Sequence, residues 1–278
     1  MNLREQAGVP AGSAEIMVDG VRFAVAREGK GPAVVCLHAI GHGGRDFEAF
    51  TSAVKDQFEV IRMDWPGQGR SGPDRQPPSA ARYAELLAGV LDQLNISKPI
   101  LIGNSIGGAA ALVYSRQHEV KVLVLCDPGG LVAVNAFVRG FCAAFAWFFG
   151  RGAAGARWFM GAFRFYYKYL VLPSAAATEQ RERIMQSAYE IAPVLQQAWR
   201  SFGRPEADIR SIAESLKIPV WFAWSKNDRV IPLQLCMPCI RRMKNAMVTP
   251  FEGGHAAFLE QPQEFVKEFL RFVHKTNS

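Results

Sequence analysis

The feature that most constrains the fold is a series of short apolar segments that alternate with longer, helix-compatible segments. Ala33–Leu37 is apolar throughout and lacks the polar alternation of a strand that faces water. Such a strand is expected where helices cover both faces of a parallel sheet. Residues 58–63, 100–102, 120–126 and 220–224 follow the same pattern, and residues 45–57, 80–94 and 107–117 have helical lengths and spacings. The order predicts an α/β fold, with a mostly parallel central sheet flanked by helices.

Two further strands are predicted near the start of the chain and one near its end. Residues 15–18 and 21–27 flank Asp19-Gly20. This two-residue turn suits the right-handed twist of an antiparallel hairpin. Ala246–Phe251 is a last short strand before a final helix. The sheet is therefore expected to begin with a hairpin.

The alternation is interrupted once, between the strand that ends at residue 126 and the strand that begins at residue 220. We therefore divide the chain into a core, residues 1–128 and 211–278, and an inserted helical cap, residues 129–210. Residues 129–178 hold 13 of the chain's 31 aromatic side chains. The predicted cap is thus the aromatic-rich part of the protein.

One predicted helix of the cap carries an aromatic stripe. Phe137, Phe141, Phe145 and Phe148 recur at steps of four, four and three residues, which places them on one helical face. Residues 129–178 also contain five cations and no acid. A cap packed on the core with a solvated basic side explains both features, and a lid over an apolar substrate is compatible with it. A third, less favoured interpretation is contact of the cap with an anionic membrane surface.

Residues 131–150 are apolar enough to imitate a membrane span. Asn135, Arg139 and Gly140 interrupt them, however, and a central arginine opposes insertion by about 2.5–3.5 kcal/mol. We therefore expect a partly exposed helix here. Residues 1–13 include Arg4 and Glu5 and no apolar stretch, which predicts that no secretory signal is present.

The composition favours a folded protein with a large core, because 49% of the 278 residues are hydrophobic. A net charge of +7 would suit an anionic partner, but no nucleic-acid-binding motif accompanies it. The five cysteines are an odd number, which indicates reduced thiols and a cytoplasmic location. Cys236 and Cys239 match C-x-x-C but lie on a predicted helix far from any redox-type strand–helix start, so we assign them no redox or metal role.

Gly103-Asn104-Ser105-Ile106-Gly107-Gly108 joins a predicted strand to a predicted helix. This is a G-x-S-x-G sequence at a strand-to-helix turn, where a serine is held on a tight bend above the sheet. The glycines let the strand and helix backbones approach closely. The pattern also occurs in ordinary glycine-rich loops, so it needs partner residues before Ser105 is a candidate nucleophile.

Two partner residues follow in the required order. Asp228 lies just beyond the predicted strand 220–224, and His255 follows the last strand on a glycine loop. Because a serine hydroxyl is a poor nucleophile, an imidazole must take its proton, and a carboxylate must orient that imidazole. Asp127 is a rival for the acid because it also follows an apolar strand. We favour Asp228, and we treat Ser105, Asp228 and His255 as the catalytic candidates.

Such a reaction also needs hydrogen-bond donors for the developing oxyanion. The backbone N–H of Ile106 would stand at a helix N-terminus, which favours negative charge. The loop after Ala33–Leu37 would emerge on the same sheet edge, and its Ile40 is the expected second donor. His42 in this loop could face the substrate, although a structural role is more common for such a histidine.

Together these motifs resemble those of α/β-hydrolases with a cap inserted after the sixth strand. Asp64-Trp65-Pro66-Gly67-Gln68-Gly69-Arg70-Ser71-Gly72 resembles the family's D-x-P-G-x-G-x-S loop, in which Asp64 is an expected loop anchor. The elbow is similar to the G-N-S-M-G-G of hydrolases that cleave carbon–carbon bonds in meta-cleavage products. Those enzymes usually carry a glycine and a tryptophan where this chain has Ala39 and Ala256, and related elbows occur in esterases.

These observations predict a serine hydrolase that cleaves an ester or thioester with an apolar part through an acyl-enzyme, without a metal or organic cofactor. Carbon–carbon bond hydrolysis, acyl transfer and a non-enzymatic small-molecule receptor on the same scaffold are the alternatives. His42, Phe137, Phe141, Phe145 and Trp158 are the candidate substrate-binding residues.

Overall fold

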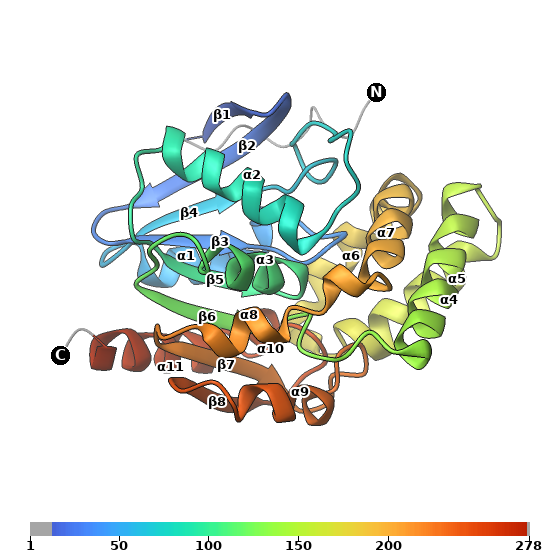
Figure 1. Cartoon of the computed structure of the whole chain (residues 1–278). Helices are drawn as coiled ribbons and strands as arrows, with labels where there is room; N and C mark the ends of the chain where they lie inside the picture. Colours follow the sequence, from blue (N-terminus) through green and yellow to red (C-terminus); the bar gives the residue numbers. More distant parts are fainter. Residues whose placement is uncertain (1–12, 277–278) are drawn as a thin grey trace.

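A twisted sheet of eight strands runs through the computed structural model, which describes residues 13–276 (Figure 1). Residues 1–12, where we predicted no secretory signal, lie outside the described part of the chain, as do residues 277–278. The strands are β1 (Ser13–Val18), β2 (Val21–Gly29), β3 (Ala33–Leu37), β4 (Glu59–Met63), β5 (Ile100–Asn104), β6 (Val122–Cys126), β7 (Val220–Ser225) and β8 (Ala246–Phe251). Each predicted strand is confirmed, with ends that differ by at most two residues.

The spatial order of the strands is β1-β2-β4-β3-β5-β6-β7-β8. Strands β3 to β8 are parallel, whereas β2 pairs antiparallel with both β1 and β4. The predicted hairpin is present, and both of its turn residues have positive φ, 49° at Asp19 and 77° at Gly20. These angles fit a turn whose twist matches that of the strands. The mostly parallel sheet is therefore confirmed.

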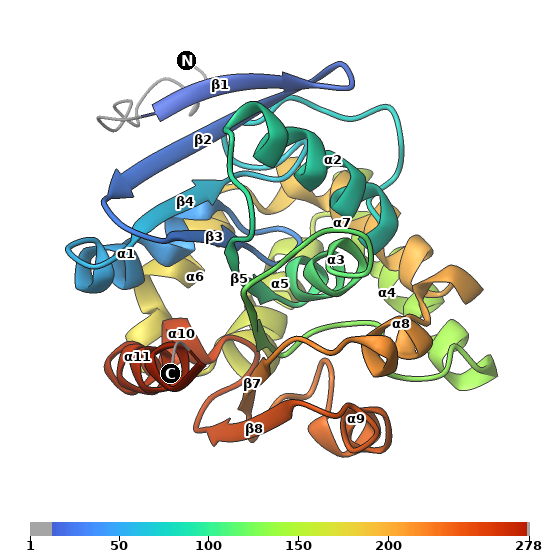
Figure 2. The ribbon, with the colours of Figure 1, turned by 60° about the vertical axis from the view of Figure 1, so that its left-hand side comes forward.

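Helices cover both faces of the sheet (Figure 2). Helices α1 and α11 lie on one face, and α2 and α3 on the other. The core helices are η2 (Gly44–Phe47), α1 (Glu48–Val54), α2 (Ala80–Gln93), α3 (Ile106–Tyr114), α9 (Leu233–Ile240), α10 (Ala257–Glu260) and α11 (Pro262–Thr276). The helix predicted over residues 45–57 is shorter than expected. At the start, the Gly44 N–H donates to the Asp64 side chain, and the short helix η2 takes the place of the first turn of α1. At the end, α1 stops just before Lys55, whose carbonyl accepts from the Lys30 N–H.

Helix α11 illustrates how sequence period produces the buried core. Phe265, Phe269 and Phe272 recur at steps of four and three, and all three are buried. The Phe265 ring lies 5.4 Å from the Trp221 ring of β7, measured between centroids. Burying a phenylalanine side chain contributes roughly 1.5–3 kcal/mol, so this stripe fixes α11 against the sheet.

The chain between β6 and β7 is mostly helical, and we call residues 129–210 the inserted segment. It contains α4 (Ala136–Ala153), α5 (Phe159–Tyr166), η3 (Tyr167–Val171), η4 (Ala175–Ala177), α6 (Thr178–Gln186), α7 (Ala188–Phe202) and η5 (Pro205–Ala207), and α8 (Arg210–Ser215) begins at its last residue. Figure 1 shows α4 to α7 beyond the carboxyl ends of the parallel strands. Within the described residues, no helix combines the length and apolarity that crossing a membrane would need.

Candidate active site

Ser105 occupies a strained position between β5 and α3. Its backbone angles are φ 53° and ψ −117°, a region that non-glycine residues rarely adopt. Such strain costs about 1–3 kcal/mol and persists only where the surroundings enforce it. Here the Ser105 N–H donates to the Cys126 carbonyl at 3.0 Å, and the Ser105 carbonyl accepts from Gly129 at 3.2 Å. The end of β6 thus holds the bend in place.

The glycines beside Ser105 are required by close packing. A Cβ atom at Gly103 would lie 2.6 Å from the Gly107 carbonyl oxygen, and one at Gly107 would overlap the carbonyl of Leu37 in β3. Real Cβ atoms do not approach backbone that closely, so larger residues would push α3 away from the sheet. The glycines therefore let α3 start directly beneath the serine.

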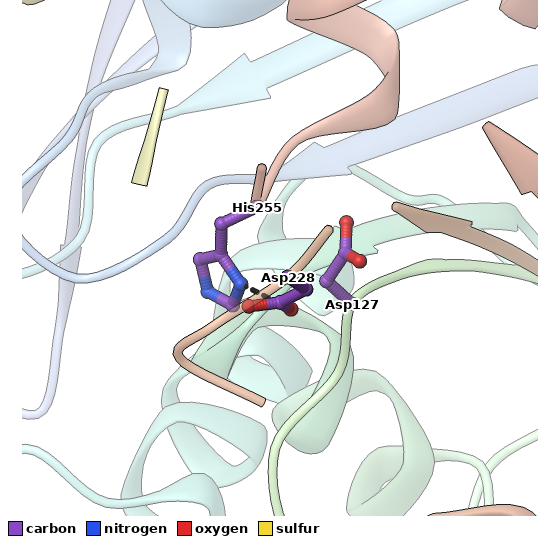
Figure 3. Close-up of side chains that lie close together, drawn as sticks. All are labelled: Asp127, Asp228 and His255. Carbon is purple, nitrogen blue, oxygen red and sulfur yellow. Dashed lines mark hydrogen bonds and ion pairs between the residues drawn. The ribbon is translucent and has the colours of Figure 1, made fainter. Parts of the chain in front are cut away.

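The structure brings Asp228 and His255 together from loops that follow β7 and β8. His255 Nδ1 lies 2.7 Å from Asp228 Oδ2, and both side chains are buried (Figure 3). The second carboxylate oxygen, Oδ1, accepts from the N–H groups of Val230 at 2.7 Å and Ile231 at 2.9 Å. The two backbone N–H groups thus fix one oxygen of the Asp228 carboxylate, and the other oxygen faces the His255 imidazole. His255 Nε2 is left available for another hydrogen-bond partner.

Asp228 also determines the proton affinity of the imidazole. Burial by itself lowers the pKa of His255, but the charge of Asp228 and its hydrogen bond outweigh burial and raise the pKa above its ordinary value. A general base needs a pKa close to the working pH. The pair therefore has the electrostatic properties of a base supported by a carboxylate.

Asp127 lies beside this pair but is bonded elsewhere. Its carboxylate accepts from the N–H of Ser225 at 2.8 Å and from the Ser225 hydroxyl at 3.1 Å. Burial raises the pKa of Asp127 well above its ordinary value, and the nearby Asp228 carboxylate raises it further. The Asp127 carboxylate oxygens are engaged by Ser225, whereas the Asp228 carboxylate is bonded to His255 Nδ1, so Asp127 is the more poorly placed partner for the histidine. The geometry therefore favours Asp228 over Asp127.

Asp127, Asp228 and His255 are close enough together to be considered as metal ligands. Their carboxylate oxygens and His255 Nδ1 are already used: His255 Nδ1 and two backbone N–H groups hold Asp228, and Ser225 holds Asp127. A carboxyl group with a strongly raised pKa is also a weak ligand, because ligation needs the deprotonated form. The residues fit a hydrogen-bonded relay better than a metal centre.

Two residues that the sequence did not identify hold the His255 loop. Asn104 Nδ2 donates to the carbonyl oxygens of His255 at 2.9 Å and of Cys126 at 3.0 Å, so it joins the elbow to the histidine loop. Glu260 accepts from the Gly254 N–H at 2.6 Å with one oxygen and from the Ser174 N–H at 3.0 Å with the other. Burial raises the pKa of Glu260, and these N–H groups partly offset that effect. Both contacts position the loop that carries His255.

Replacing Asn104 with alanine is expected to lower kcat for an ester substrate about 10- to 100-fold, because small displacements of a catalytic group have effects of this size. The loss should come with little change in KM and with a shifted pH profile, since the position of His255 relative to Asp228 sets its pKa. Asn245→Ala is the matched control, because it removes an amide hydrogen bond to the Lys217 carbonyl at an exposed site. Equal losses in both variants would contradict a positioning role for Asn104.

The loop after β3 is ordered around Ile40. The N–H of Gly41 donates to Gln68 Oε1 at 2.6 Å, and the N–H of His42 donates to the Ala39 carbonyl at 3.3 Å. Ile40 and Ile106 both line the cavity that contains Ser105, and Ile106 is the first residue of α3, so its N–H lacks an intrahelical acceptor. Ile40 and Ile106 therefore remain the candidate backbone donors to the oxyanion. Gly41 is excluded as a donor, because its N–H is already bonded to Gln68.

Asp64 anchors this loop, as predicted from the sequence. Its carboxylate accepts from the N–H of Gly44 at 2.7 Å and from the N–H of Arg70 at 2.9 Å. His38 has a structural role beside it: its Nε2 accepts from the Trp65 N–H at 2.8 Å, and burial lowers the pKa of this histidine. The loop that carries Ile40 is therefore tied to the loop after β4.

His42 forms a second buried histidine–aspartate pair next to Ser105. Its Nδ1 lies 2.6 Å from Asp46 Oδ2, and the other oxygen of Asp46 accepts from Gln180 in α6. The Tyr167 ring lies 5.8 Å from the His42 ring, measured between centroids. These contacts join the loop after β3 to the inserted segment at the wall of the cavity.

A cavity of about 760 Å³ lies between the sheet edge and the inserted segment. Ser105 and His255 line it, together with three of the predicted substrate-binding residues, His42, Phe137 and Phe141. Most of the remaining lining is apolar and includes Val132, Val138, Tyr166, Leu195, Trp199 and Ile231. The cavity thus offers an apolar chamber next to the candidate nucleophile.

The predictions for Phe145 and Trp158 were wrong, because neither side chain lines this cavity. Phe145 stacks on Trp199, with ring centroids 4.4 Å apart, and Trp199 lines the cavity whereas Phe145 does not. Trp158 lies on the outside of the segment, where it stacks on Trp147. The stripe period correctly identified the helix, but only the packing of α4 on α7 decides which aromatic rings reach the cavity.

The five cysteines are buried and unpaired. Burial raises the pKa of the Cys239 thiol to about 12 and raises the pKa of Cys236 as well. Such thiols are poor nucleophiles and poor metal ligands, which agrees with the structural role expected for the C-x-x-C sequence. The cytoplasmic location inferred from these cysteines stays a prediction.

Comparison with known proteins identifies the class of protein. Residues 34–268 match the model of the alpha/beta hydrolase family, and the chain belongs to this family. The protein is therefore an enzyme with the α/β-hydrolase fold, as the sequence motifs predicted.

Among its relatives, a 2-hydroxy-6-oxononadienedioate/2-hydroxy-6-oxononatrienedioate hydrolase from a Pseudomonas species is 26% identical over 261 residues, covering 86% of this chain and 87% of the relative. A putative lipase from Acinetobacter baumannii has a similar structure, with a TM-score of 0.80 and 20% identity over 95% of this chain and 91% of that one. An esterase from Thermogutta terrifontis has a TM-score of 0.78 and 19% identity, covering 96% and 99%.

Proposed function

We propose that the protein is a serine hydrolase that cleaves a carboxylic ester or thioester with an apolar acyl or alcohol part. The observation that carries this proposal is the hydrogen-bonded His255–Asp228 pair, which shares an apolar cavity with Ser105 on its strained turn. Residues 129–210 act as a cap that closes this cavity.

In the first half of the reaction, Ser105 Oγ attacks the substrate carbonyl carbon while His255 Nε2 takes the hydroxyl proton. Asp228 holds the Nδ1 proton and stabilises the imidazolium that forms. The carbonyl oxygen becomes negatively charged and accepts from the N–H groups of Ile40 and Ile106. Removing one such donor typically costs about 10²- to 10³-fold in kcat, so these two N–H groups account for a large part of the rate.

In the second half, the imidazolium returns the proton to the leaving alcohol or thiol, and an acyl group stays bound to Ser105. His255 then takes a proton from a water molecule, whose oxygen attacks the acyl carbon. The bond between that carbon and Ser105 Oγ breaks, His255 returns its proton to Oγ, and a carboxylic acid leaves. Each bond made to Ser105 is thus broken again, and the enzyme needs no metal or organic cofactor for this cycle.

The lining of the cavity supports an uncharged, apolar substrate. Arg82, the buried cation of the lining, is paired with Asp74 at 2.7 Å and with Asp19 at 2.7 Å, so its charge is already compensated. An anionic substrate would gain little from it, whereas each buried CH₂ group would contribute about 0.8 kcal/mol. Apolar contacts with Leu195 and Trp199 fit an acyl chain or a hydrophobic alcohol.

Carbon–carbon bond hydrolysis of a dienoate is the second candidate, and the Pseudomonas relative is the observation that favours it. It would use the same Ser105, Asp228 and His255. Its substrate carries carboxylate groups, however, and the exposed Arg204 and Arg229 are the cations of the cavity lining left to bind them. Neither a receptor function nor acyl transfer has a specific contact that favours it over these two reactions.

A substrate series tests the proposal. With p-nitrophenyl esters, kcat/KM should rise about fourfold for each CH₂ added between acetate and hexanoate, because each group contributes about 0.8 kcal/mol of binding in the cavity. A 2-hydroxy-6-oxo-dienoate serves as the competing substrate. Turnover of the dienoate with no ester activity would replace the proposal with the second candidate, and no labelling of Ser105 by a fluorophosphonate would reject both.

A further inference from the structure

Helices α4 and α5 expose aromatic side chains to solvent. Trp147 and Phe165 are 64% and 60% exposed, and Trp158 and Tyr169 are 47% and 49% exposed. Trp147 of α4 stacks on Trp158, the residue before α5, with ring centroids 6.0 Å apart, and Phe165 of α5 contacts Tyr169 of η3 at 4.9 Å. Large exposed aromatic side chains that gather in one region of a surface indicate an interaction site.

The helical period places these rings on one side of the helix pair. In α4, the buried Cys142, Ala146 and Phe149 share one face, and Trp147 and Arg151 lie on the opposite face. In α5 the buried side chains Phe159, Phe163 and Tyr166 likewise share one face, and the exposed side chains lie away from it. Figure 1 shows α4 and α5 side by side at the edge of the molecule, far from α11. We call their solvent-exposed side the outer face.

Cations accompany the aromatic rings, and acids are missing. Residues 129–178 contain no Asp or Glu and five cations, namely Arg139, Arg151, Arg157, Arg164 and Lys168, all of which are exposed. Ion pairs elsewhere in the inserted segment, such as Arg183 with Glu48 and Arg210 with Asp208, use other cations. Lys168 instead lies over the Tyr169 ring at 5.3 Å from its centroid. Arg139 shares the Cys142 side of α4, whereas Arg151 and Arg164 lie opposite the buried side chains of α4 and α5. The outer face, where Arg151 and Arg164 lie, is thus cationic and aromatic at once.

We propose that the outer face binds the surface of a lipid bilayer that contains anionic lipids. Helices with aromatic and basic side chains lie in the interfacial plane of a bilayer, where Trp and Tyr rings occupy the headgroup layer and cations attract anionic lipids. A second copy of the chain fits poorly, because symmetric pairing would bring the outer-face cations of one copy against those of the other.

The position of the cavity agrees with an orientation in which the outer face lies on the bilayer. Phe137, at the start of α4, lines the cavity and is also 77% exposed, so the cavity reaches the surface next to the outer face. A bilayer on this face would lie beside the entrance, where an apolar molecule could pass from lipid toward Ser105. Membrane binding itself does not depend on the proposed reaction.

Vesicle flotation of the full chain tests this binding separately from catalysis. Both the wild type and Ser105→Ala should float with vesicles of phosphatidylcholine and phosphatidylglycerol, and less with phosphatidylcholine alone or at raised salt. The double variant Arg151→Glu/Arg164→Glu should lower the partition coefficient by at least about tenfold, since each cation near an anionic surface contributes about 1 kcal/mol. Trp147→Ala/Phe165→Ala should lower it on both vesicle types.

Arg241→Glu/Lys244→Glu is the matched control, because it changes the net charge equally at exposed positions after α9. Met17→Ala is the control for loss of an exposed apolar side chain. Unchanged unfolding midpoints and unchanged hydrolysis of a short ester would show that the outer-face variants fold. Three results would overturn the proposal: no flotation of the wild type, equal losses in the control variants, or a dimer in light scattering that the outer-face substitutions dissociate.

Discussion

Ser105→Ala is expected to lower kcat for p-nitrophenyl esters by at least about 10⁴-fold, the size of loss seen when a serine nucleophile is removed. Without Oγ no acyl-enzyme can form, and only the oxyanion donors and substrate binding are left to accelerate direct attack by water. KM should change little, because the hydroxyl contributes a small part of the cavity wall. Initial rates across a substrate series measure both constants, and mass spectrometry after fluorophosphonate treatment should find no adduct on the variant.

Ser115→Ala provides the comparison for this experiment. Ser115 follows α3 directly, and its hydroxyl donates to the Ala111 carbonyl outside the cavity lining, so its loss should leave kcat within about twofold of the wild type. Alanine tolerates the backbone angles of position 105 no worse than serine does, and the unfolding midpoint should therefore stay close to that of the wild type. Residual activity above a few per cent in Ser105→Ala would mean that another group forms the covalent bond.

Much of the fold follows from local patterns in this chain. Strands β3 and β6 are covered on both faces of the sheet, and each is therefore a continuous hydrophobic segment in the sequence. The hairpin turn at Asp19-Gly20 needs residues that accept positive φ, and the sequence provides them. Ser105 and His255 could be predicted for a related reason, because residues just beyond parallel strands gather at one sheet edge.

The residues that hold the site in place could not be predicted in this way. Asn104 reaches the His255 carbonyl across 151 positions of sequence, and Glu260, which also accepts from Gly254, reaches the Ser174 N–H across 86. Such hydrogen bonds leave no trace in local composition or period. Phe145 and Trp158 failed for a similar reason, since the period of a helix identifies its faces but not the neighbour that each face meets.

Replacing Asp228 with asparagine is expected to lower kcat about 10³- to 10⁴-fold. An asparagine can keep the backbone N–H donors of Val230 and Ile231, so the loop should keep its shape. It cannot stabilise the imidazolium of His255, however, and it favours the wrong tautomer of the ring when its amide group faces Nδ1. Kinetic measurements at saturating ester, together with an unchanged unfolding midpoint, check this prediction.

The pH dependence gives a second measurement on the same variant. His255 must be neutral to accept the serine proton, so kcat/KM rises with pH through the pKa of this histidine in the free enzyme. Because Asp228 raises that pKa, the rise in the wild type should be centred above the ordinary histidine value of about 6.5. In Asp228→Asn the carboxylate is gone and burial of the ring dominates, so the rise should move to lower pH while its plateau falls.

Asp127→Asn decides between the two acids. The carboxylate bonded to His255 is that of Asp228, whereas the Asp127 carboxylate accepts from the N–H and the hydroxyl of Ser225, so an asparagine here replaces a side chain whose hydrogen bonds go to Ser225. Its side-chain oxygen can still accept from Ser225, and kcat should fall less than about tenfold, with the pH profile nearly unchanged. If instead Asp127→Asn caused the larger loss and moved the rise to lower pH, Asp127 would be the acid that supports His255, and Asp228 would only shape the loop after β7.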